Sequence, residues 1–291
     1  MNQKVALFAL ENVKYTSFLQ IAEYHRLQGD SINWYSALQH YEYDKVYCAS
    51  LFDFTDKSMV RPDMICGGTG FDIETKLPPE IESCGYDYSI YPKCKISFLW
   101  FSRGCFRTNK ICPWCVVPKK EGMIHSVEPK NLNPNGTEIH IMDDNPFANP
   151  DKDKMVDFVL KSNQPVTFTS GIDCRLPIED YGPDLKRMKL KRVHTAWDNP
   201  QDDLTENLKA LTKYVPAWKI GVYVLIGAGS TREEDWHRVT EIEKIGMDPW
   251  VMPYDLSDPY QRRFRNLVNR VPRFKEALKE GTSKPSYLKG V

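Results

Sequence analysis

The sequence has no net charge, no long apolar run and no internal repeat. Its 39 basic and 39 acidic side chains cancel, so no overall field attracts the protein to nucleic acid or to an anionic membrane. No apolar run approaches the roughly 20 residues that span a bilayer, and the apolar part of the first ten residues is too short for a secretory signal. We therefore expect a cytoplasmic protein with no membrane partner.

Three of the eight cysteines cluster in one loop. Without a secretory signal, eight cysteines indicate metal chemistry in a reducing compartment and not a disulfide scaffold. Cys105, Cys112 and Cys115 follow the apolar run Ile96 to Phe101, which predicts a buried strand. A closed zinc site takes four protein ligands and a disulfide takes two, whereas three thiolates on a four-iron cluster leave one iron open. We interpret the other cysteines as packed thiols: Cys48, Cys66, Cys84, Cys94 and Cys174.

The cysteine loop resembles the radical S-adenosylmethionine superfamily. In that family three loop cysteines hold a [4Fe-4S] cluster, and the methionyl amino and carboxylate groups of S-adenosylmethionine chelate the fourth iron. An aromatic residue commonly precedes the last cysteine, and Trp114 stands there. The usual spacing is Cys-x3-Cys-x2-Cys, whereas this loop has Cys-x6-Cys-x2-Cys; longer first gaps do occur in the superfamily. The resemblance implies that Cys105, Cys112 and Cys115 are the metal ligands.

Two other interpretations of the loop stay open. A zinc site would need a fourth ligand, which Cys94 or His125 could supply, and would make the chain a zinc-stabilised module that binds nucleic acid or protein. Its interaction face would be the basic loop with the aromatic side chains of Trp100, Phe106 and Trp114. The second alternative is an iron–sulfur electron-transfer protein without S-adenosylmethionine chemistry.

Residues 1–90 alternate strand-like and helical patterns, which predicts a small doubly wound α/β domain. One predicted strand runs into Gly67-Gly68-Thr69-Gly70, which is either a tight turn or a phosphate cradle. The arrangement resembles the cobalamin-binding-like domain that precedes the barrel in one branch of the same superfamily. Because the chain has no Asp-x-His-x-x-Gly motif, we predict that this domain does not bind cobalamin. Prolines at both ends and Gly85 between them predict a linker over residues 78–94.

Residues 91–291 show a more regular alternation of strands and helices, which predicts a partial (β/α)6 TIM-like barrel with a C-terminal helical extension. The resemblance implies the same fold over residues 96–255. The predicted strands are Ile96–Ser102, Glu138–Met142, Val166–Thr169, Arg192–Ala196, Gly221–Ile226 and Pro249–Met252. The predicted helices are Asp151–Lys161, Ile178–Met188, Asp202–Tyr214, Arg232–Ile245 and Arg262–Lys279.

Polar residues follow several of these strands, which is where barrel enzymes carry their reactive side chains. Asp143 and Asp144 follow the second strand. The resemblance implies that this position contacts the amino group of S-adenosylmethionine, so either carboxylate would accept that hydrogen bond.

The next three strand ends supply the other candidate cofactor-binding residues. Arg175, after the third strand, would pair with the methionyl carboxylate through its planar fork, and Asp173 would bind ribose hydroxyls or substrate. Asp198 follows the fourth strand. Gly227 follows the fifth, in a turn that resembles the one passing beneath adenosine in the family, because glycine lets a backbone approach a ligand closely.

The resemblance implies an enzyme that makes a radical. The cluster would pass one electron to the sulfonium of S-adenosylmethionine, and homolytic C–S cleavage would give a 5′-deoxyadenosyl radical that abstracts hydrogen from a substrate. The loop also carries five basic side chains: Arg103, Arg107, Lys110, Lys119 and Lys120. They form an ordinary solvated surface, balance the charge of a thiolate-rich cluster, or dock an acidic electron donor such as flavodoxin or ferredoxin. The open side of a partial barrel would admit a peptide, a protein or a nucleic acid as substrate, and the sequence does not select among them.

Overall fold

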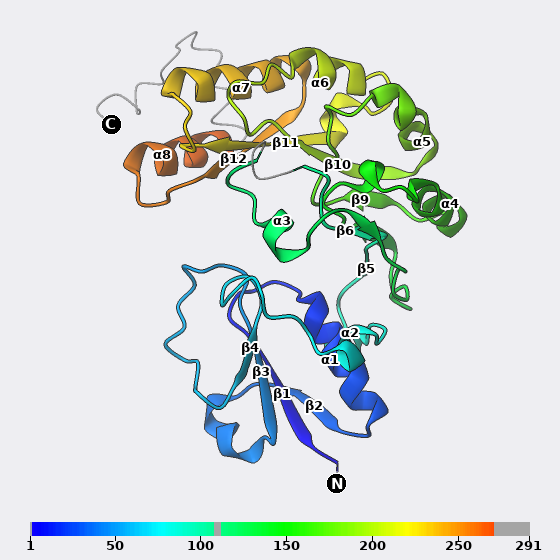
Figure 1. Cartoon of the computed structure of the whole chain (residues 1–291), viewed down its shortest axis with the longest axis vertical. Coiled ribbons are helices and arrows are strands. Elements are labelled where there is room, and N and C mark those ends of the chain that lie inside the picture. The colour runs from blue at the N-terminus through cyan, green and yellow to red at the C-terminus, as the bar shows by residue number, and fades with distance from the viewer. Residues whose placement is uncertain (1, 108–111, 271–291) are drawn as a thin grey trace. The chain divides into compact units, whose positions relative to one another are not determined.

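Two β-sheets divide the chain into two units (Figure 1). The structure is a computed structural model that describes residues 2–107 and 112–270. The first unit comprises Met1–Phe98 and Pro129–Thr137, and the second comprises Leu99–Glu128 and Glu138–Val291. Two predictions lie outside the described residues: Lys110 in the basic loop, and the part of the last helix beyond residue 270.

The first unit contains a four-stranded parallel sheet in the order β2-β1-β3-β4. Its strands are β1 (Lys4–Ala9), β2 (Ser31–Trp34), β3 (Lys45–Ala49) and β4 (Ile65–Gly67). Helix α1 (Thr16–Leu27) connects β1 to β2, and the 3-10 helix η1 (Ala37–Glu42) precedes β3. Parallel strands need such crossovers, because the chain must return to the same end of the sheet. The predicted α/β class with parallel strands is confirmed for this unit.

Both faces of this first sheet are covered, as is usual for parallel strands. Successive side chains of a strand point to opposite faces. Val5 and Leu7 therefore pack with Phe18 of α1 on one face, whereas Ala6 packs with Val46 of β3 on the other. Burial of each large apolar side chain contributes roughly 1.5–3 kcal/mol, so the two small cores together hold the unit.

The stretch 78–94 is folded into the first unit, so the prediction of a linker was wrong. It forms α2 (Pro79–Glu82) and the 3-10 helix η2 (Tyr88–Ile90), and it buries the side chains of Ile81, Tyr86 and Tyr88. Proline is favoured at the first position of a helix, and α2 begins with one. A proline that starts a helix and a proline that interrupts one look alike in a sequence, which explains the error.

The glycines after β4 are needed for close packing with the loop after β3. Gly68 has a φ of +97°, a conformation that favours glycine. A Cβ atom on either Gly68 or Gly70 would collide with Ser50. The structure therefore favours the tight turn over the phosphate cradle.

The second unit is organised by a six-stranded sheet in the order β12-β11-β10-β9-β8-β5. Its strands are β5 (Ile96–Leu99), β8 (Glu138–Ile141), β9 (Val166–Phe168), β10 (Leu190–Ala196), β11 (Ile220–Ile226) and β12 (Asp248–Pro253). Every neighbouring pair from β8 to β12 is parallel. The division between the two units falls inside β5. The predicted strands are all present in the predicted order, and the α/β class is confirmed here too.

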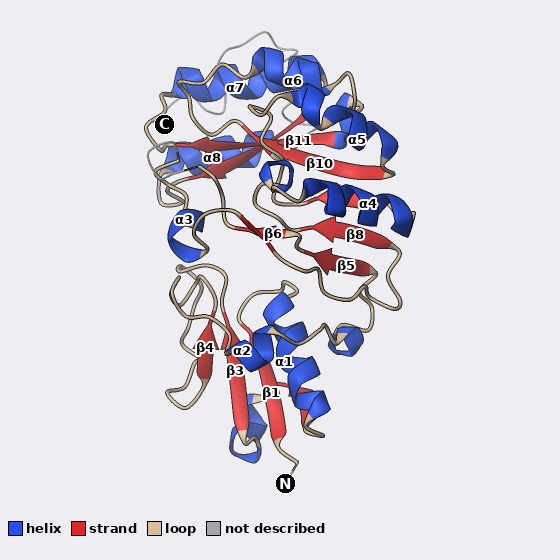
Figure 2. Cartoon of the chain, turned by 45° about the vertical axis from the view of Figure 1, so that its right-hand side comes forward, coloured by secondary structure: helices blue, strands red, loops and turns tan. Residues whose placement is uncertain are grey.

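Helices cover one face of this sheet (Figure 2). They are α4 (Lys152–Ser162), α5 (Gly182–Arg187), α6 (Thr205–Leu211) and α7 (Arg232–Ile245), and the 3-10 helices η3 (Pro146–Ala148), η4 (Ile178–Asp180) and η5 (Ala217–Lys219) lie in the connections. The bounds of α7 were predicted correctly because both ends carry strong signals. Thr231 and Glu234 form a capping box at its start, and Gly246 ends it with a φ of +88°.

Helix α8 (Pro259–Val268) protects the outer edge of the sheet. Asn269, directly after α8, accepts a hydrogen bond from the backbone N–H of Val251 (2.8 Å) and donates one to its carbonyl oxygen (3.0 Å). An edge strand otherwise leaves such groups free to pair with another chain. One side chain thus satisfies both edge groups of a residue in β12.

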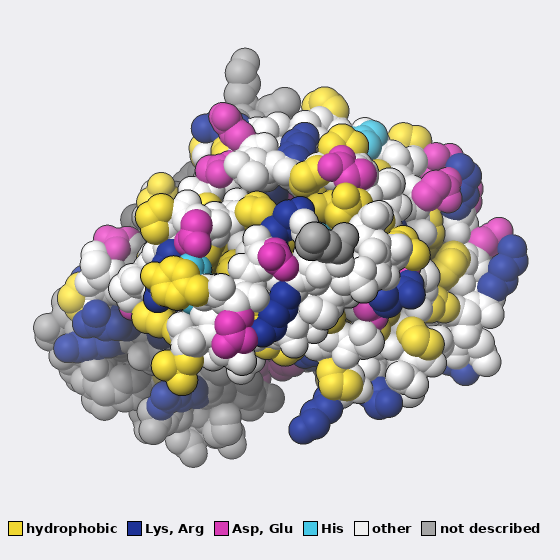
Figure 3. Space-filling view, turned by 90° about the horizontal axis from the view of Figure 1, so that it is seen from below, with side chains coloured by type: hydrophobic (Ala, Val, Ile, Leu, Met, Phe, Trp, Pro, Cys, Tyr) yellow, Lys and Arg dark blue, Asp and Glu magenta, His cyan; other side chains and the backbone are white. Residues whose placement is uncertain are grey.

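The surface shows no concentration of one charge on the face seen in Figure 3, where basic and acidic side chains are interspersed. This agrees with the zero net charge of the sequence. Across residues 2–107 and 112–270, no helix combines the length and the apolar character that a bilayer crossing requires.

Glu11 collects hydrogen-bond donors at the end of β1. Its carboxylate accepts bonds from the side chains of Tyr15, Ser50 and Thr55 and from the backbone N–H groups of Leu51 and Phe52. Although burial acts to raise the pKa of Glu11, these donors lower it from 4.5 to about 2. The carboxylate therefore fixes the loop after β3 against the end of β1.

Replacing Glu11 by Gln is expected to destabilise the protein at pH 7 by about 1–3 kcal/mol, because donors that face a carboxylate would face a neutral amide. The folded pKa of Glu11 lies below the unfolded value, so its contribution is present above about pH 4.5 and is lost as the pH falls toward 2. The difference in melting temperature between the native protein and E11Q should therefore shrink between pH 7 and pH 3.

Glu42→Gln is the matched control, because Glu42 forms an exposed ion pair with Lys4 and should contribute little. A difference for E11Q that stays constant with pH would contradict the role given to the Glu11 charge.

Candidate functional site

The three clustered cysteines lie in a loop that a short hairpin closes. Strand β6 (Ser102–Arg103) pairs antiparallel with β7 (His125–Ser126), and Arg103 forms an ion pair with Glu121 at 2.6 Å. Gly104 has a φ of +78°, and a Cβ atom there would lie 2.6 Å from a carbonyl oxygen on the other side of the loop. Glycine at position 104 therefore lets the two sides of the loop meet.

Cys105, Cys112 and Cys115 are half-buried and lie within electrostatic range of one another. A turn joins the last two, in which the N–H of Cys115 donates to the carbonyl oxygen of Cys112 at 3.0 Å, and Trp114 lies half-buried in that turn. The N–H of Arg107 donates to the sulfur of Cys105 at 3.4 Å. The structure thus brings the three predicted ligands into one neighbourhood.

Burial raises the pKa of both Cys112 and Cys115. Arg175 and Arg107 oppose this for Cys112, and the N–H of Val117 opposes it for Cys115. A thiol must lose its proton before it binds a metal. The two guanidinium groups stabilise the thiolate that such binding would produce.

Asp173 connects the cysteine loop to the segment after β9. One carboxylate oxygen accepts a hydrogen bond from Nε of Arg107 in the loop, and the other accepts one from Nε of Arg175 at 2.8 Å. Arg175 also donates to Asp202 at 3.2 Å. The Asp173 side chain is only 7% exposed, and although burial acts to raise its pKa, the two arginines lower it. The chain itself therefore occupies the carboxylate that was expected to bind ribose or substrate.

The two aspartates after β8 have different roles. Asp143 is buried, and its carboxylate accepts hydrogen bonds from the N–H of Phe101 (3.0 Å) and the hydroxyl of Ser102. Asp144 accepts no hydrogen bond from any residue that the structure describes. Burial and the nearby Glu121 raise the pKa of Asp144 to about 7, against the influence of Arg103. Of the two predicted acceptors, Asp144 is the one available to a ligand.

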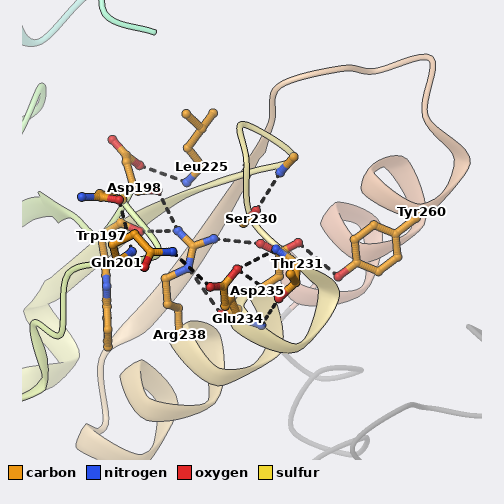
Figure 4. Close-up of polar contacts among 12 residues, drawn as sticks. Trp197, Asp198, Gln201, Leu225, Ser230, Thr231, Glu234, Asp235, Arg238 and Tyr260 are labelled. Atoms are coloured by element: carbon orange, nitrogen blue, oxygen red, sulfur yellow. Dashed lines mark hydrogen bonds and ion pairs between the residues drawn. The ribbon is translucent and has the colours of Figure 1, made fainter. Parts of the chain in front are cut away.

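Asp198 at the end of β10 is held by a buried network around Arg238 (Figure 4). Arg238 donates to the carbonyl oxygens of Trp197 (2.8 Å) and Asp198 (2.9 Å) and pairs with Asp235 at 2.8 Å. The Asp198 carboxylate accepts a hydrogen bond from the N–H of Leu225 in β11 at 2.9 Å. Burial raises the pKa of Asp198, while the N–H of Leu225 and the charges of Arg238 and Arg175 oppose the shift. Because Arg238 comes from α7, this helix fixes the strand end.

Gly227 begins the exposed turn after β11 with a φ of +78°. A Cβ atom there would collide with the side chain of Gln261 at the start of α8, which is itself a reason for glycine. The buried side-chain oxygens of Asn145 and Thr169, after β8 and β9, have no hydrogen-bond partner among the described residues. Unpaired buried polar atoms are unusual in folded proteins. Both lie in the segments that follow neighbouring strands.

Sequence reasoning missed Asp202 and Arg238 as site residues. Asp202 stood at a predicted helix start, where an aspartate is ordinary. Arg238 follows Asp235 by three residues on α7, a spacing typical of a surface ion pair. Nothing in the sequence distinguishes this pair from exposed ones, although both side chains are only 1% exposed.

No group of three His, Cys, Asp or Glu side chains in the described ranges lies close enough to hold a metal ion. Residues 108–111, four of the six that separate Cys105 from Cys112, are not among those ranges. His125, a possible fourth zinc ligand, is exposed, and its Nδ1 lies 3.0 Å from the carbonyl oxygen of Met123. In chemical type, three thiols with two arginines nearby match a group that takes three thiolates, but in this structure the three sulfurs are not close enough together to hold one metal ion.

Fold and site together define an α/β protein with a thiol-rich site near the carboxyl end of a parallel sheet. Comparisons of the chain with protein-family models, with curated proteins and with solved structures found no match. The resemblance to the radical S-adenosylmethionine superfamily therefore depends on the residues of this chain alone.

Asp144→Asn is expected to stabilise the protein more at pH 8 than at pH 5. The pKa of Asp144 is raised from 3.8 to about 7, so the folded protein holds a proton over that range that the unfolded chain has lost. Stability therefore falls as the pH rises from about 4 to 7 and stays lower above it. Each kcal/mol should appear as about 2–4 °C in melting temperature. Asp157→Asn, on the exposed side of α4, is the control; an equal change in D144N at both pH values would refute the assignment.

Arg238→Leu is expected to destabilise the protein by about 3–5 kcal/mol, because it leaves the Asp235 charge buried without its partner. The double variant with Asp235→Leu should lose less than R238L alone. Urea unfolding measures both values. Lys209→Ala breaks an exposed pair with Glu206 and should cost no more than about 1 kcal/mol. Equal losses for R238L and K209A would show that the buried pair does not hold the strand end.

Proposed function

We propose that this protein is a radical S-adenosylmethionine enzyme with a [4Fe-4S] cluster on Cys105, Cys112 and Cys115. The observation that carries the proposal is that these three half-buried thiols come from one loop and interact electrostatically with one another, with two arginines acting on Cys112. The sheet supports it, since six strands in sequential order with helices on one face are what a partial (β/α)6 barrel would contain. When bound, the cluster supplies the electron that cleaves S-adenosylmethionine and so generates a radical able to take hydrogen from a substrate.

The residues around the thiols have chemistry suited to the two ends of a methionyl group. Asp144 has a carboxylate with no described partner, suited to an ammonium group. Arg175 uses Nε and Nη1 for Asp173 and Asp202, which leaves Nη2 to donate to a carboxylate. Asp198 lies within electrostatic range of both Arg175 and Cys112, so it belongs to the same site.

The partners follow from the same proposal. Lys119 and Lys120 lie on α3 (Val117–Lys120), directly after the last cysteine, where they would receive an acidic electron donor such as flavodoxin or ferredoxin. The substrate is a peptide, a protein or a nucleic acid, admitted through the open side of the sheet. The first unit would keep a cobalamin-binding-like fold without cobalamin.

A zinc-stabilised binding module and an iron–sulfur electron carrier are the competing functions. The two candidate fourth zinc ligands have partners of their own: Cys94 is buried with its Sγ 3.6 Å from the carbonyl oxygen of Ile96, and Nδ1 of the exposed His125 lies 3.0 Å from the carbonyl oxygen of Met123. This supports a three-thiolate group over a closed zinc site. The aspartates and arginine beside the thiols favour a bound ligand over electron transfer alone.

Anaerobically purified protein is expected to contain about four iron and four sulfide per chain, as the four-iron cluster requires. Reduction with dithionite in the presence of S-adenosylmethionine should release 5′-deoxyadenosine, measured by chromatography. Cys112→Ala should lower that release at least about 100-fold, because two thiolates remain where a full set for such a cluster is four ligands.

Cys84→Ala is the matched control, because Cys84 lies directly after α2 in the first unit and should not affect the cluster. One zinc per chain in place of iron would contradict the proposal and support the zinc-stabilised binding module. Iron and sulfide without release of 5′-deoxyadenosine would contradict the proposal and support the iron–sulfur electron carrier.

A further inference from the structure

The second sheet has a polar face opposite its helix-covered face. Phe168 of β9 packs on Phe147 of η3, so its side chain lies on the helix-covered side. Ile141 and Val193 are in register with Phe168 and are likewise buried on that side. Strand residues that alternate with these point the other way. We call that side the polar face, and its central side chains are His140, Thr167, Arg192, His194, Tyr223 and Trp250.

His194 is locked in one orientation at the centre of the polar face. Its Nδ1 lies 2.8 Å from the carbonyl oxygen of Phe168, which can only accept, so Nδ1 carries the proton of the neutral ring. The ring stacks on Tyr223 with centroids 5.1 Å apart and planes 12° apart. Tyr223 in turn donates its hydroxyl to the carbonyl oxygen of Thr169 at 3.2 Å. Two strands therefore hold the imidazole from two sides.

The other nitrogen of His194 keeps a free lone pair. Nε2 has no hydrogen-bond partner among the described residues. The buried side-chain atoms that lack a partner do not include Nε2, so this atom is exposed to solvent. It lies over Gly221, where a Cβ atom would come within 3.3 Å of Nε2 and 2.8 Å of Cδ2. Glycine at position 221 thus leaves room for the ring edge.

The charges around His194 keep the ring neutral. Burial lowers the pKa of His194, and Arg192 on the same strand and His140 on β8 lower it further. The carboxylate of Asp248 on β12 is paired with Arg192 at 2.6 Å. Burial raises the pKa of Tyr223 on β11, so its hydroxyl keeps its proton. Neither Asp248 nor Tyr223 therefore offers His194 a free anion. A neutral imidazole with its Nδ1 proton fixed is a hydrogen-bond acceptor at Nε2.

Aromatic side chains on the neighbouring strands lie beside His194 on the polar face. Trp250 of β12 is in register with Tyr223 of β11, so both rings point to the polar face, and Trp250 is 51% exposed. Met252, two residues along on the same face, is 43% exposed. Exposed aromatic rings of this kind bind other flat rings by stacking, at about 1–3 kcal/mol per ring.

We propose that the polar face binds the substrate through a flat ring that stacks on Trp250 and Tyr223 and donates an N–H hydrogen bond to Nε2 of His194. The proposal deepens the function proposed above, since it names the chemistry of the substrate. The proposal rests on the proposed function only where it concerns the reaction of the bound substrate. The binding itself needs neither the cluster nor S-adenosylmethionine.

Reaction of the full-length protein with diethyl pyrocarbonate tests the acceptor, because the reagent modifies neutral imidazole nitrogens. Mass spectrometry of digested protein would locate the product. N-acetylhistidine serves as reference, because its pKa of about 6.5 predicts a roughly eightfold slower reaction at pH 5.5 than at pH 7. His194 should slow by a smaller factor than the reference, because its pKa is lowered. A His194 that stays unmodified while the reference reacts would overturn the proposal.

Indole and 1-methylindole form a matched pair of ring probes, because both stack and only indole donates an N–H hydrogen bond. At millimolar concentration indole should slow the modification of His194 at least about threefold, and 1-methylindole should not. Trp250→Ala should remove the protection by indole without changing the rate measured in its absence. Equal protection by both probes, or by neither, would overturn the hydrogen bond to His194.

Two variants separate binding from structural support. His194→Asn retains a side-chain N–H for the carbonyl oxygen of Phe168 and removes Nε2, so it should fold normally and bind indole no more tightly than 1-methylindole in equilibrium dialysis. Gly221→Ala should displace the ring edge and slow modification of His194 at least about fivefold. Indole that binds H194N as tightly as it binds the native protein would overturn the proposal, whatever the outcome of the iron and 5′-deoxyadenosine measurements.

Discussion

The shared carboxylate of Asp173 is the constraint on which the site in the second unit depends. It binds one arginine from the cysteine loop and one from its own segment after β9, at a position that is nearly closed to water. A buried carboxylate with two guanidinium partners is hard to disrupt, because loss of either partner leaves charge uncompensated in a poorly solvated place. The cysteine loop, which is also paired at its β6–β7 base, is therefore held to the segment after β9 close to its three cysteines.

Parallel strand pairing makes this arrangement possible. Each strand from β8 to β12 ends at the same edge of the sheet, so segments far apart in sequence meet there. Arg238 provides a second anchor at that edge, since it reaches from α7 to the carbonyl oxygens after β10. Some polar side chains at this edge, such as Asp143, hold the segments together through hydrogen bonds. Others, such as Asp144, accept no hydrogen bond from the described residues and are available to a ligand.

The first unit uses the same principle for a structural purpose. Glu11 lies at the end of β1, where a ligand-binding carboxylate would be expected in a doubly wound sheet. Its oxygens are taken up by five donors of the chain, most of them in the loop after β3, and its pKa is low for that reason. The nearby glycines pack against the same loop. A position at the end of a strand therefore does not by itself identify a binding residue. A side chain at that position must also have hydrogen-bond donors or acceptors that the chain itself does not occupy.

Local patterns in the sequence determined the strands of the second sheet, the bounds of α7, the α/β class and the grouping of three cysteines. These features depend on residues a few positions apart, whose periodicity and capping are visible in one dimension. Only the tertiary structure decided that Asp144 and not Asp143 is available, that Asp173 is already paired, and that residues 78–94 belong to a core. Arg107 lies 66 residues from Asp173, and Phe101 lies 42 residues from Asp143. A hydrogen bond over such a separation leaves no local pattern to read.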